Sequence, residues 1–549
     1  MGLLGNLKGA KGDTGLVANY AVSALKSAVN APDLVFITDS GKEGVWKRDL
    51  TDTVSADNVG TVMVDNLGKR WKRQFENNIN VTWFGAKGDN STNNNPFFIL
   101  AVDYCRINSK NLYIPKGEYV TSIYFPTRQE VISGILDFNN ITVFGDGKKS
   151  IIKTVSAGGA DVLQLNAIKN ITFRDLGITG VKTNAADLTN GINGVSITNG
   201  GENITIDRVH VFDLPFVDNG VFIDGSKAFT IQRGSTGTSD LSNIRILNCT
   251  AAGCKYGYIL QTSLFTQIYK GMLVTGCYFD VDYIGIQVDI PIPTSGTNKN
   301  SNCSATITNN FIKNAQIGIV LGVANNVVAQ NNTFSNLLNT TPVASFDARK
   351  ISLVMQGSQF CNVQGNVFSY INANCYCSIE GIAGQPNETC IIKNVFNGSC
   401  TGKAVRLSYS GTESIKNSVL ETLATGNADV KYDVTIFEKA YNNIIVDSYL
   451  ERGFATYEAK NTSSYTTTKY DVGKTLALNS STPQTVILSD LVHESTVTFI
   501  QYGTGQVTFT AGTLTPINFA GKLKTAGQFA IVKGIVVGTN VFLTGDLLN

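Results

Sequence analysis

The phrase NITIDRVHVFD, residues 203–213, decides the fold because variants of it recur along the chain. Other copies read NITFRDLGI from Asn170 and NIRILNCTAAG from Asn243. Each copy has an Asn, a strand with alternating apolar residues and a polar turn, and a second alternating strand follows after a Gly. Further copies begin at Gly271, Ala305, Asn326, Cys361, Cys390, Ile415 and Asn443. Spacings from the low twenties to about forty residues predict a parallel β-solenoid with one coil for each phrase.

The Asn at the repeated turn supports a solenoid over a β-sandwich, which would also contain many short strands. In stacked coils each side-chain amide can bond the Asn above and the Asn below. The ten cysteines lack C-x-x-C spacing, which argues against a zinc site and a disulfide scaffold. We therefore expect buried thiols, with Asn, Cys and Val columns inside the solenoid.

Composition excludes several function classes. The chain has 44 basic and 42 acidic residues and only 16% charged residues, so a nucleic acid partner is not expected. No apolar stretch is long enough to span a membrane, and the first thirty residues contain no secretory signal pattern, so we expect synthesis in the cytoplasm of the host cell. The chain has only two histidines, which argues against Ser-His catalysis and against metal sites built from several histidines. Any catalysis would therefore depend on carboxylates.

Four segments are predicted. Residues 1–32 combine collagen-like Gly triplets, either a flexible leader or a short three-chain contact, with one short helix that ends before Pro32. Residues 33–77 form a small β-rich module that packs Trp46 and Trp71, and residues 78–469 form the solenoid. Residues 470–549 form an antiparallel β module for association or receptor binding.

Two motifs carry a family resemblance. The stretches NVTWFGAKGDNST, residues 80–92, and LYIPKGEYV, residues 112–120, resemble the entry motif and first coil of the pectate-lyase-like β-helix superfamily. This chain has Asn90 where the family usually has Gly, and residues 93–95 are Asn where it has paired Asp. The resemblance implies an all-β protein with a right-handed parallel β-helix, capped by a helix over residues 97–106.

The flanking segments resemble phage proteins. GVWKRDL, residues 44–50, and ADNVGTVMVDNLGKRWKR, residues 56–73, are similar to a domain that precedes such β-helices in phage tail proteins. Residues 503–547 are similar to a module at the ends of phage tail fibres. Together they imply a homotrimeric tailspike located in the virion tail, anchored through its N-terminus to tail or baseplate proteins. Its partner would be a bacterial capsular, exo- or lipopolysaccharide.

Carboxylates on stacked coils are the candidate catalysts, because glycoside hydrolysis needs two of them. Aligning coils on their aromatic residue puts Asp213 in the column of Asp280, two coils on and roughly 9–10 Å away. A second column, four residues after the Gly, contains Asp224, Gln261 and Asp289, and Asp282 and Asp218 flank both columns. We expect Asp213 and Asp280 to be the acid/base pair, supported by Asp282, Asp224 and Asp289, although a single Asp is more often a turn residue.

Substrate contacts are predicted around the same coils. Tyr rings can stack on sugar faces, and the candidates are Tyr256, Tyr258 and Tyr283, with Tyr269 and Tyr278 close in sequence. Gln261, Glu380 and Arg406 are candidate polar contacts, the last two near the register of the second column. An Arg facing carboxylates is what a uronate lyase needs. No metal or cofactor is expected, and calcium only for a lyase.

The sequence thus predicts a tailspike that binds and depolymerises a bacterial surface polysaccharide, by hydrolysis rather than elimination. Two other functions stay open, a non-catalytic receptor-binding fibre and a polysaccharide lyase. The flanking modules disfavour a free bacterial enzyme. The groove can lie within one chain or between chains of a trimer.

Overall fold

The computed structural model describes most of the chain, and all statements below concern the residues it describes. These residues are 17–125, 135–157, 159–183, 191–215, 226–232, 240–261, 268–289, 303–337, 351–370, 375–380, 387–388, 390–397, 405–407, 414–415, 418–420, 423–425, 432–434, 444–446, 457–473 and 475–549. The chain divides into two compact units, Met1–Asn417 with Ala424–Asp433, and Ser418–Leu423 with Val434–Asn549. The Gly triplets of residues 1–16 lie outside the described residues.

A small sheet follows the N-terminus, in the order β1-β2-β3-β5-β4. Its elements are β1 (Ala18–Tyr20), α1 (Val22–Ser27), β2 (Leu34–Ile37), β3 (Gly44–Asp49), β4 (Val62–Val64) and β5 (Arg70–Arg73). Trp46 and Trp71 are buried together in its core, as predicted. The predicted helix is shorter than its periodicity indicated, because residues 18–20 pair with β2 as a parallel strand.

The predicted entry motif begins the large sheet. Its elements are β6 (Asn78–Asn80), a 3₁₀ helix (Val81–Phe84), β7 (Asp89–Asn93), α2 (Asn95–Asn108), β8 (Asn111–Ile114) and β9 (Gly117–Val120). Asn94 replaces the family's Asp and is fully buried, where its side chain bonds both backbone groups of Lys87. The expected capping helix is therefore present, and the change from Asp to Asn keeps the turn before it bonded.

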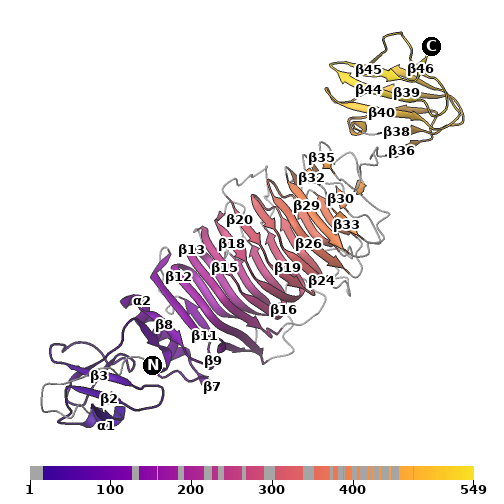
Figure 1. Ribbon diagram of the computed structural model, residues 1–549. Coiled ribbons are helices and arrows are strands. Elements are labelled where there is room, and N and C mark those ends of the chain that lie inside the picture. Colours follow the sequence, from indigo (N-terminus) through magenta and orange to yellow (C-terminus); the bar gives the residue numbers. More distant parts are fainter. Residues whose placement is uncertain are drawn as a thin grey trace. The chain divides into compact units, whose positions relative to one another are not determined.

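The body of the protein is a parallel β-helix, seen in Figure 1 as strands β12 to β29 lying side by side. Its further strands are β10 (Ile123–Phe125), β11 (Leu136–Ser156), β12 (Ala160–Lys182), β13 (Ile192–Phe212), β14 (Lys227–Gln232), β15 (Leu241–Leu247), β16 (Thr250–Gln261), β17 (Tyr269–Lys270), β18 (Met272–Thr275), β19 (Tyr278–Asp289), β20 (Ala305–Thr308), β21 (Phe311–Lys313), β22 (Ile317–Gly322), β23 (Val327–Gln330), β24 (Thr333–Leu337), β25 (Ile351–Gln356), β26 (Asn362–Tyr370), β27 (Cys375–Glu380), β29 (Ile391–Asn397), β30 (Val405–Leu407), β32 (Ser418–Leu420), β33 (Leu423–Thr425), β34 (Tyr432–Val434) and β35 (Ile444–Val446). Strands β28 (Asn387–Glu388) and β31 (Ser414–Ile415) form a separate parallel pair.

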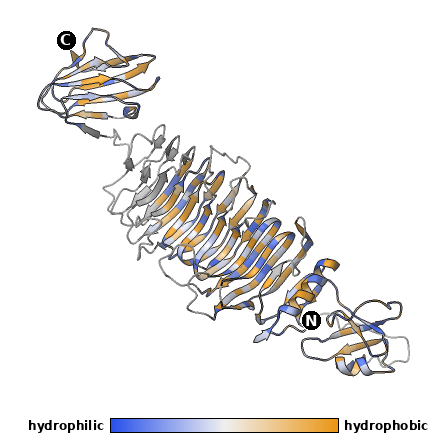
Figure 2. Cartoon of the chain, turned by 180° about the vertical axis from the view of Figure 1, so that it is seen from behind, coloured by the Kyte–Doolittle hydropathy of each residue, from blue (hydrophilic) through white to orange (hydrophobic). Residues whose placement is uncertain are grey.

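The strand register confirms the predicted coil lengths. Thr306 pairs with Val328, 22 residues on, and Ile204 pairs with Ile244, 40 residues on. Figure 2 shows hydrophobic and hydrophilic residues alternating along these strands. Because side chains alternate between the two faces of a strand, one set fills the interior and the other faces outward.

A buried ladder of asparagines runs through the interior, as the repeated Asn predicted. Asn310 donates from Nδ2 to Oδ1 of Asn332 (2.9 Å), Asn332 to Asn366 (2.8 Å) and Asn366 to Asn394 (2.8 Å). Each Nδ2 also donates to a backbone carbonyl of the preceding coil. The seven cysteines with described side chains are buried and form no disulfides, which confirms the prediction for them.

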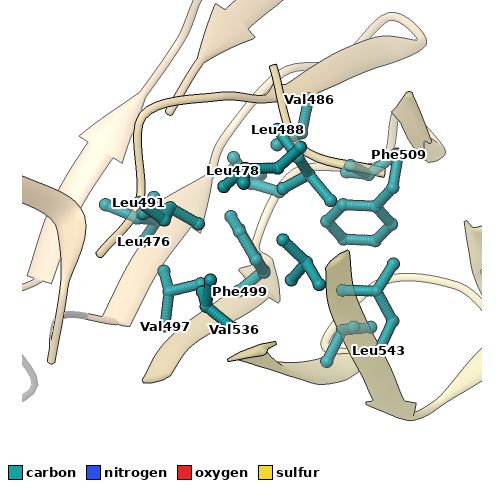
Figure 3. Packing of buried hydrophobic residues seen from close by; sticks show 14 residues of the cluster. Leu476, Leu478, Val486, Leu488, Leu491, Val497, Phe499, Phe509, Val536 and Leu543 are labelled. Carbon is teal, nitrogen blue, oxygen red and sulfur yellow. The ribbon is translucent and has the colours of Figure 1, made fainter. Parts of the chain in front are cut away.

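The C-terminal unit packs two sheets around one apolar core, part of which is drawn in Figure 3. Its elements are β36 (Tyr457–Lys460), β37 (Ser464–Thr466), a 3₁₀ helix (Lys469–Asp471), β38 (Thr475–Leu478), β39 (Gln484–Leu488), β40 (Thr496–Gln501), β41 (Val507–Ala511), β42 (Thr515–Ile517), β43 (Lys524–Thr525), β44 (Ile531–Val537), β45 (Asn540–Gly545) and β46 (Leu547–Leu548).

The prediction of an antiparallel module was wrong for the first half of this unit. Strands β36, β38 and β40 pair in parallel in one sheet, and β37, β39 and β41 pair in parallel in the other. The short connections, such as residues 479–483, pass from one sheet to the other instead of closing hairpins. Antiparallel pairing begins with β43, which joins β41 and β46, and continues with β44, which joins β40 and β45.

Candidate functional site

The first half of β19 brings three of the predicted residues to one outer face. Phe279 and Val281 are buried, whereas Tyr278 and Asp282 are exposed and Asp280 is half-buried. The alternation of a β-strand therefore puts Tyr278, Asp280 and Asp282 on the outside of the β-helix. Strand β16 precedes this strand in the stack, and β21 follows it.

The structure corrects the alignment of Asp213 with Asp280. Phe212 pairs with Ala252, and Ala252 pairs with Asp280, so Phe212 occupies the column of Asp280. The two phenylalanines used for the alignment face opposite sides, because the buried Phe279 shares its column with Val211. Asp213 lies one residue beyond the column, where its left-handed φ of 51° turns the chain.

Asp213 instead leans toward the next coil, which lies between it and β19. Its Oδ1 lies 3.0 Å from the point where a Cβ of Gly253 would be, so the carboxylate leans over the glycine. Burial raises the pKa of the Cys254 thiol to about 12, and the charges of Asp213 and Asp282 both add to this rise. The two carboxylates thus lie close to the same buried thiol.

Asp280 is held by the following coil. Its Oδ1 accepts a hydrogen bond from Nδ2 of Asn314 (2.6 Å), and its Oδ2 lies 4.0 Å from Nζ of Lys313. Asn314 in turn accepts a hydrogen bond from Asn336 (2.5 Å). This carboxylate begins an outer ladder and is fixed in position, whereas Asp213 and Asp282 are exposed.

An exposed aromatic pair lies beside these carboxylates. The rings of Tyr278 and Phe311 are stacked, with centroids 5.4 Å apart and planes at 4°. Their side chains are 39% and 38% exposed, and the two residues are paired on β19 and β21. The sequence reading missed Phe311, although it follows Asn310 just as Tyr278 follows Cys277, and this shared position was the available signal.

The three tyrosines predicted to bind substrate are buried. Tyr258 is 1% exposed among core residues, and burial raises its pKa. Tyr256 and Tyr283 pack edge to face, with centroids 5.5 Å apart, in an apolar cluster that includes Ile259 and Ile284. Tyr269 is also buried, and its hydroxyl bonds the backbone of Asn325. The predicted stacking role was therefore wrong for Tyr256, Tyr258 and Tyr283. The number of tyrosines in a coil does not show which of them are buried and which are exposed to a substrate.

The second predicted column is present in part. Gln261 pairs with Asp289, and Gln232 occupies the preceding coil, with its Nε2 donating to Gln261 (3.1 Å). Gln232 thus takes the place predicted for Asp224, and both Asp224 and Asp218 lie outside the described residues. Burial raises the pKa of Asp289 to about 6, and Nε2 of Gln287 is 3.4 Å from its Oδ2.

Glu380 and Arg406 follow farther along the same sheet. Glu380 pairs with Gln356, which continues the column through Gly322 to Asp289. Arg406 pairs with Ser378, two residues before Glu380. Their side chains lie outside the described part of the structure.

The predicted carboxylate patch is split into two places. Asp282 and Asp289 are separated by seven residues of one strand, β19, which is roughly 20 Å of extended chain. Among the described residues no group of three His, Cys, Asp or Glu side chains could hold a metal ion. None of the described helices is long and apolar enough to cross a membrane.

Comparison with known proteins defines the class. Residues 23–76 match the family described as phage tail protein small four-stranded beta-sheet domain. This segment contains the four strands β2 to β5. The chain therefore combines a phage tail domain with a parallel β-helix that follows it in sequence.

One protein of known class is similar to part of the chain in sequence. Over 175 residues the chain is 29% identical to the Mu-like prophage FluMu defective tail fiber protein of Haemophilus influenzae. The alignment covers 30% of this chain and 25% of that protein, so the chain matches about a quarter of its relative's length.

Solved structures with some likeness include two phage tailspikes. The capsular polysaccharide depolymerase gp49 of the Acinetobacter baumannii bacteriophage Fri1 is 12% identical, covers 97% of this chain and 92% of its own, and gives a TM-score of 0.38. The enzymatically active domain of tailspike protein 2 from bacteriophage CBA120 is 12% identical, with 78% and 56% covered and a TM-score of 0.41. The mannuronan C-5 epimerase A-module of Azotobacter vinelandii is 16% identical, with 67% and 98% covered and a TM-score of 0.37. Likeness of this degree carries no argument, and the β-helix assignment rests on the strand pairings.

Proposed function

We propose that this chain is a phage tailspike that binds a bacterial capsular, exo- or lipopolysaccharide on the outer face of its β-helix and depolymerises it. The observation that carries the proposal is the exposed Tyr278–Phe311 stack on the same outer face as Asp280 and Asp282. Aromatic faces pack against the apolar faces of sugar rings, and adjacent carboxylates can supply acid and base. The phage tail domain at residues 23–76 supports a place in the virion tail.

Asp213 and Asp282 are the proposed catalytic pair, in place of Asp213 and Asp280. Asp282 lies two coils on from Asp213, which is roughly 9–10 Å along the stack. The carboxyl group of Asp213 lies against Gly253, on the coil between the two residues, and we take it to point toward Asp282. An inverting glycosidase needs roughly 6.5–9.5 Å, enough for a water molecule between carboxylate and sugar. Asp280, fixed by Asn314 and Lys313, serves to position the substrate.

The rest of the proposal concerns assembly. The protein is made in the cytoplasm of the infected host, attaches through its N-terminal domain to tail or baseplate proteins, and acts as a homotrimer. Sedimentation of the purified protein as a monomer would overturn the trimer and leave the glycan site unaffected.

The decisive experiment measures cleavage and binding together. Polysaccharides from candidate hosts are incubated with the protein, and new reducing ends and the ultraviolet absorbance of unsaturated uronates are followed in parallel. Hydrolysis gives reducing ends without absorbance. Asp213→Asn and Asp282→Asn should each reduce turnover at least a hundredfold while binding is retained. Asp490→Asn, the same chemical change at an exposed turn of the C-terminal unit, should leave turnover unchanged.

Each other outcome decides against part of the proposal. Absorbance at the uronate band would make the enzyme a lyase and direct attention to Arg406. A polysaccharide that binds without any cleavage would make the protein an adhesive receptor-binding fibre. Full activity in both Asn variants would reject the proposed pair.

A further inference from the structure

The C-terminal unit exposes a second aromatic pair. The rings of Tyr502 and Phe529 meet edge to face, with centroids 5.9 Å apart and planes at 84°. The two side chains are 47% and 61% exposed. A large exposed aromatic surface of this kind on a folded protein often marks a binding site.

The backbone at Phe529 is held in a disfavoured conformation. Its φ of 68° lies in the left-handed region, which bulky side chains rarely adopt. Its N–H donates to the carbonyl of Gln501 (2.6 Å), which fixes the turn at the end of β40. Such outliers persist where the surrounding structure enforces them, and they cluster at functional sites.

A buried glutamine, Gln501, holds the backbone next to the pair in place. Gln501 is 1% exposed, its Oε1 accepts the hydroxyl of Thr525, and its Nε2 donates to the carbonyl of Gly503 (3.2 Å). Its N–H donates to the carbonyl of Ala530 (3.0 Å), the residue after Phe529. Gln501 thus ties together the two turns that carry the rings, with its side chain bonded to Gly503 and its backbone bonded to Phe529 and Ala530, so the aromatic corner is preorganised.

Neutral polar groups surround the corner. The amide of Gln528 donates to the carbonyl of Tyr502 (3.0 Å). The turn after Tyr502 packs closely against a loop rich in hydroxyl side chains. A Cβ added to Gly503 would lie only 2.1 Å from the carbonyl oxygen of Ser480 in that loop. Within that loop the hydroxyls of Ser480 and Thr482 are 3.1 Å apart.

We propose that the Tyr502–Phe529 corner is a second carbohydrate site, which binds a pyranose ring of a cell-surface glycan without cleaving it. A sugar ring offers apolar C–H faces to the aromatic planes and hydroxyls to amide and hydroxyl neighbours. The right angle between the two rings allows one to cover a sugar face while the other contacts its edge. This site lies outside the β-helix and does not depend on the proposed catalysis.

The test removes each aromatic pair from the full-length protein. Tyr278→Ala/Phe311→Ala serves as the background, and titration calorimetry measures its binding of purified capsular polysaccharide and lipopolysaccharide from a host strain. Adding Phe529→Gly should weaken the remaining binding about tenfold. Glycine adopts φ of 68° without strain, so the thermal stability of this variant should not fall. Tyr502→Ala should weaken binding as well, whereas Phe519→Ala, a change at an exposed ring on another turn, should not.

Two results would overturn the proposal. One is loss of all glycan binding in the Tyr278→Ala/Phe311→Ala background, which would assign all binding to the β-helix. The other is unchanged glycan binding in Phe529→Gly, and a simultaneous change in sedimentation would identify the corner as a protein contact. Neither result bears on cleavage, so the proposed function stands or falls separately.

Discussion

The two exposed aromatic pairs rest on supports of different kinds. Tyr278 and Phe311 lie parallel on neighbouring strands of the β-helix, and Phe311 directly follows Asn310 of the buried ladder. Tyr502 and Phe529 meet edge to face on turns tied by individual hydrogen bonds. Strand register sets the first arrangement, in a column that holds Thr250 before Tyr278 and Thr333 after Phe311. The second arrangement depends on its own backbone strain. Carboxylates accompany the first pair, which is why we assign it chemistry as well as binding.

The largest effect is expected when the buried support of the first pair is removed. Asn310→Ala leaves the N–H of Cys277 and the carbonyl of Val274 without their side-chain partner. Two buried groups that lose their hydrogen bonds should cost about 4 kcal/mol of unfolding free energy. Urea unfolding measures the loss, and hydrogen exchange shows whether it is confined to the β-helix.

A matched change separates the buried ladder from the exposed one. At the surface Asn243 donates to Asn203 and accepts from Nε of Arg245, and its φ is 50°, so Asn243→Gly keeps the turn and removes two exposed hydrogen bonds. We expect a cost below about 1 kcal/mol. Equal costs for Asn310→Ala and Asn243→Gly would show that the interior ladder does not support the coils.

The next largest effect concerns the carboxylates beside the first pair. Gly253→Ala puts a Cβ 3.0 Å from Oδ1 of Asp213, so the carboxylate must move away from its proposed position. A Cβ at this distance shifts its neighbour by a few tenths of an ångström, and because a displacement of about 1 Å costs roughly a hundredfold in turnover, this shift should cost about tenfold. Steady-state kinetics should show a lower kcat and a KM changed less than twofold.

Gly271→Ala is the control for backbone strain. Gly271 has a similar φ of 64°, and its nearest neighbouring atom to a new Cβ is 3.7 Å away. It should therefore share the destabilisation of Gly253→Ala without the loss of turnover. If both variants lose activity equally, strain in the turns and not the place of Asp213 limits catalysis.

A third prediction uses the pH dependence of the β-helix surface. Burial raises the pKa of Asp289 from its ordinary 3.8 to about 6, so the folded protein holds this proton more tightly than the unfolded chain. The stabilising contribution is complete below about pH 4 and disappears as the pH rises through 6. Relative to Asp289→Asn, the wild-type protein should lose about 2 kcal/mol of stability between pH 4 and 7. Chemical denaturation of both proteins across this range measures the difference.

Asp289→Asn keeps the shape of the side chain and removes its ionisation, so the difference from the wild-type protein at each pH isolates this titration. A stability difference between Asp289→Asn and wild type that does not vary with pH would show that Asp289 titrates as it does in the unfolded chain.

The coil repeat and the inner columns were predictable because they follow from periodicity alone. Asn at the repeated turn predicted the ladder from Asn310 to Asn394, and the motif at residues 80–92 predicted the entry to the β-helix. Outer columns were less predictable. The sequence alignment assumed that Phe212 and Phe279 face the same side of the sheet. The register instead puts Phe212 in the outward column of Asp280, and the left-handed turn comes one residue later, at Asp213.

The burial of individual tyrosines was equally hard to predict from the sequence. Tyr258 and Tyr278 belong to similar coils, yet one fills the core and the other is exposed, because corners of the β-helix interrupt the strict alternation of a strand. The parallel pairing of β36, β38 and β40 could not be read from short Gly-rich connections, which also suit hairpins. In both cases the sequence pattern locates the strand. The side that a residue faces, and the direction of pairing, depend on which strands lie next to it in the fold.

The smallest predicted effect tests the comparison of the two pairs directly. Phe311→Ala removes half of the parallel stack and should weaken polysaccharide binding about tenfold and raise KM accordingly. Phe529→Gly should weaken binding to intact cell-surface glycan to a similar extent but leave kcat/KM on short oligosaccharides unchanged, because the corner is proposed to bind glycan without taking part in its cleavage. The two effects on binding should add when the variants are combined, since independent sites contribute independently. A combined loss much smaller than the product of the single losses would mean that one glycan segment contacts both pairs, and the division between a catalytic face and a separate binding corner would then be wrong.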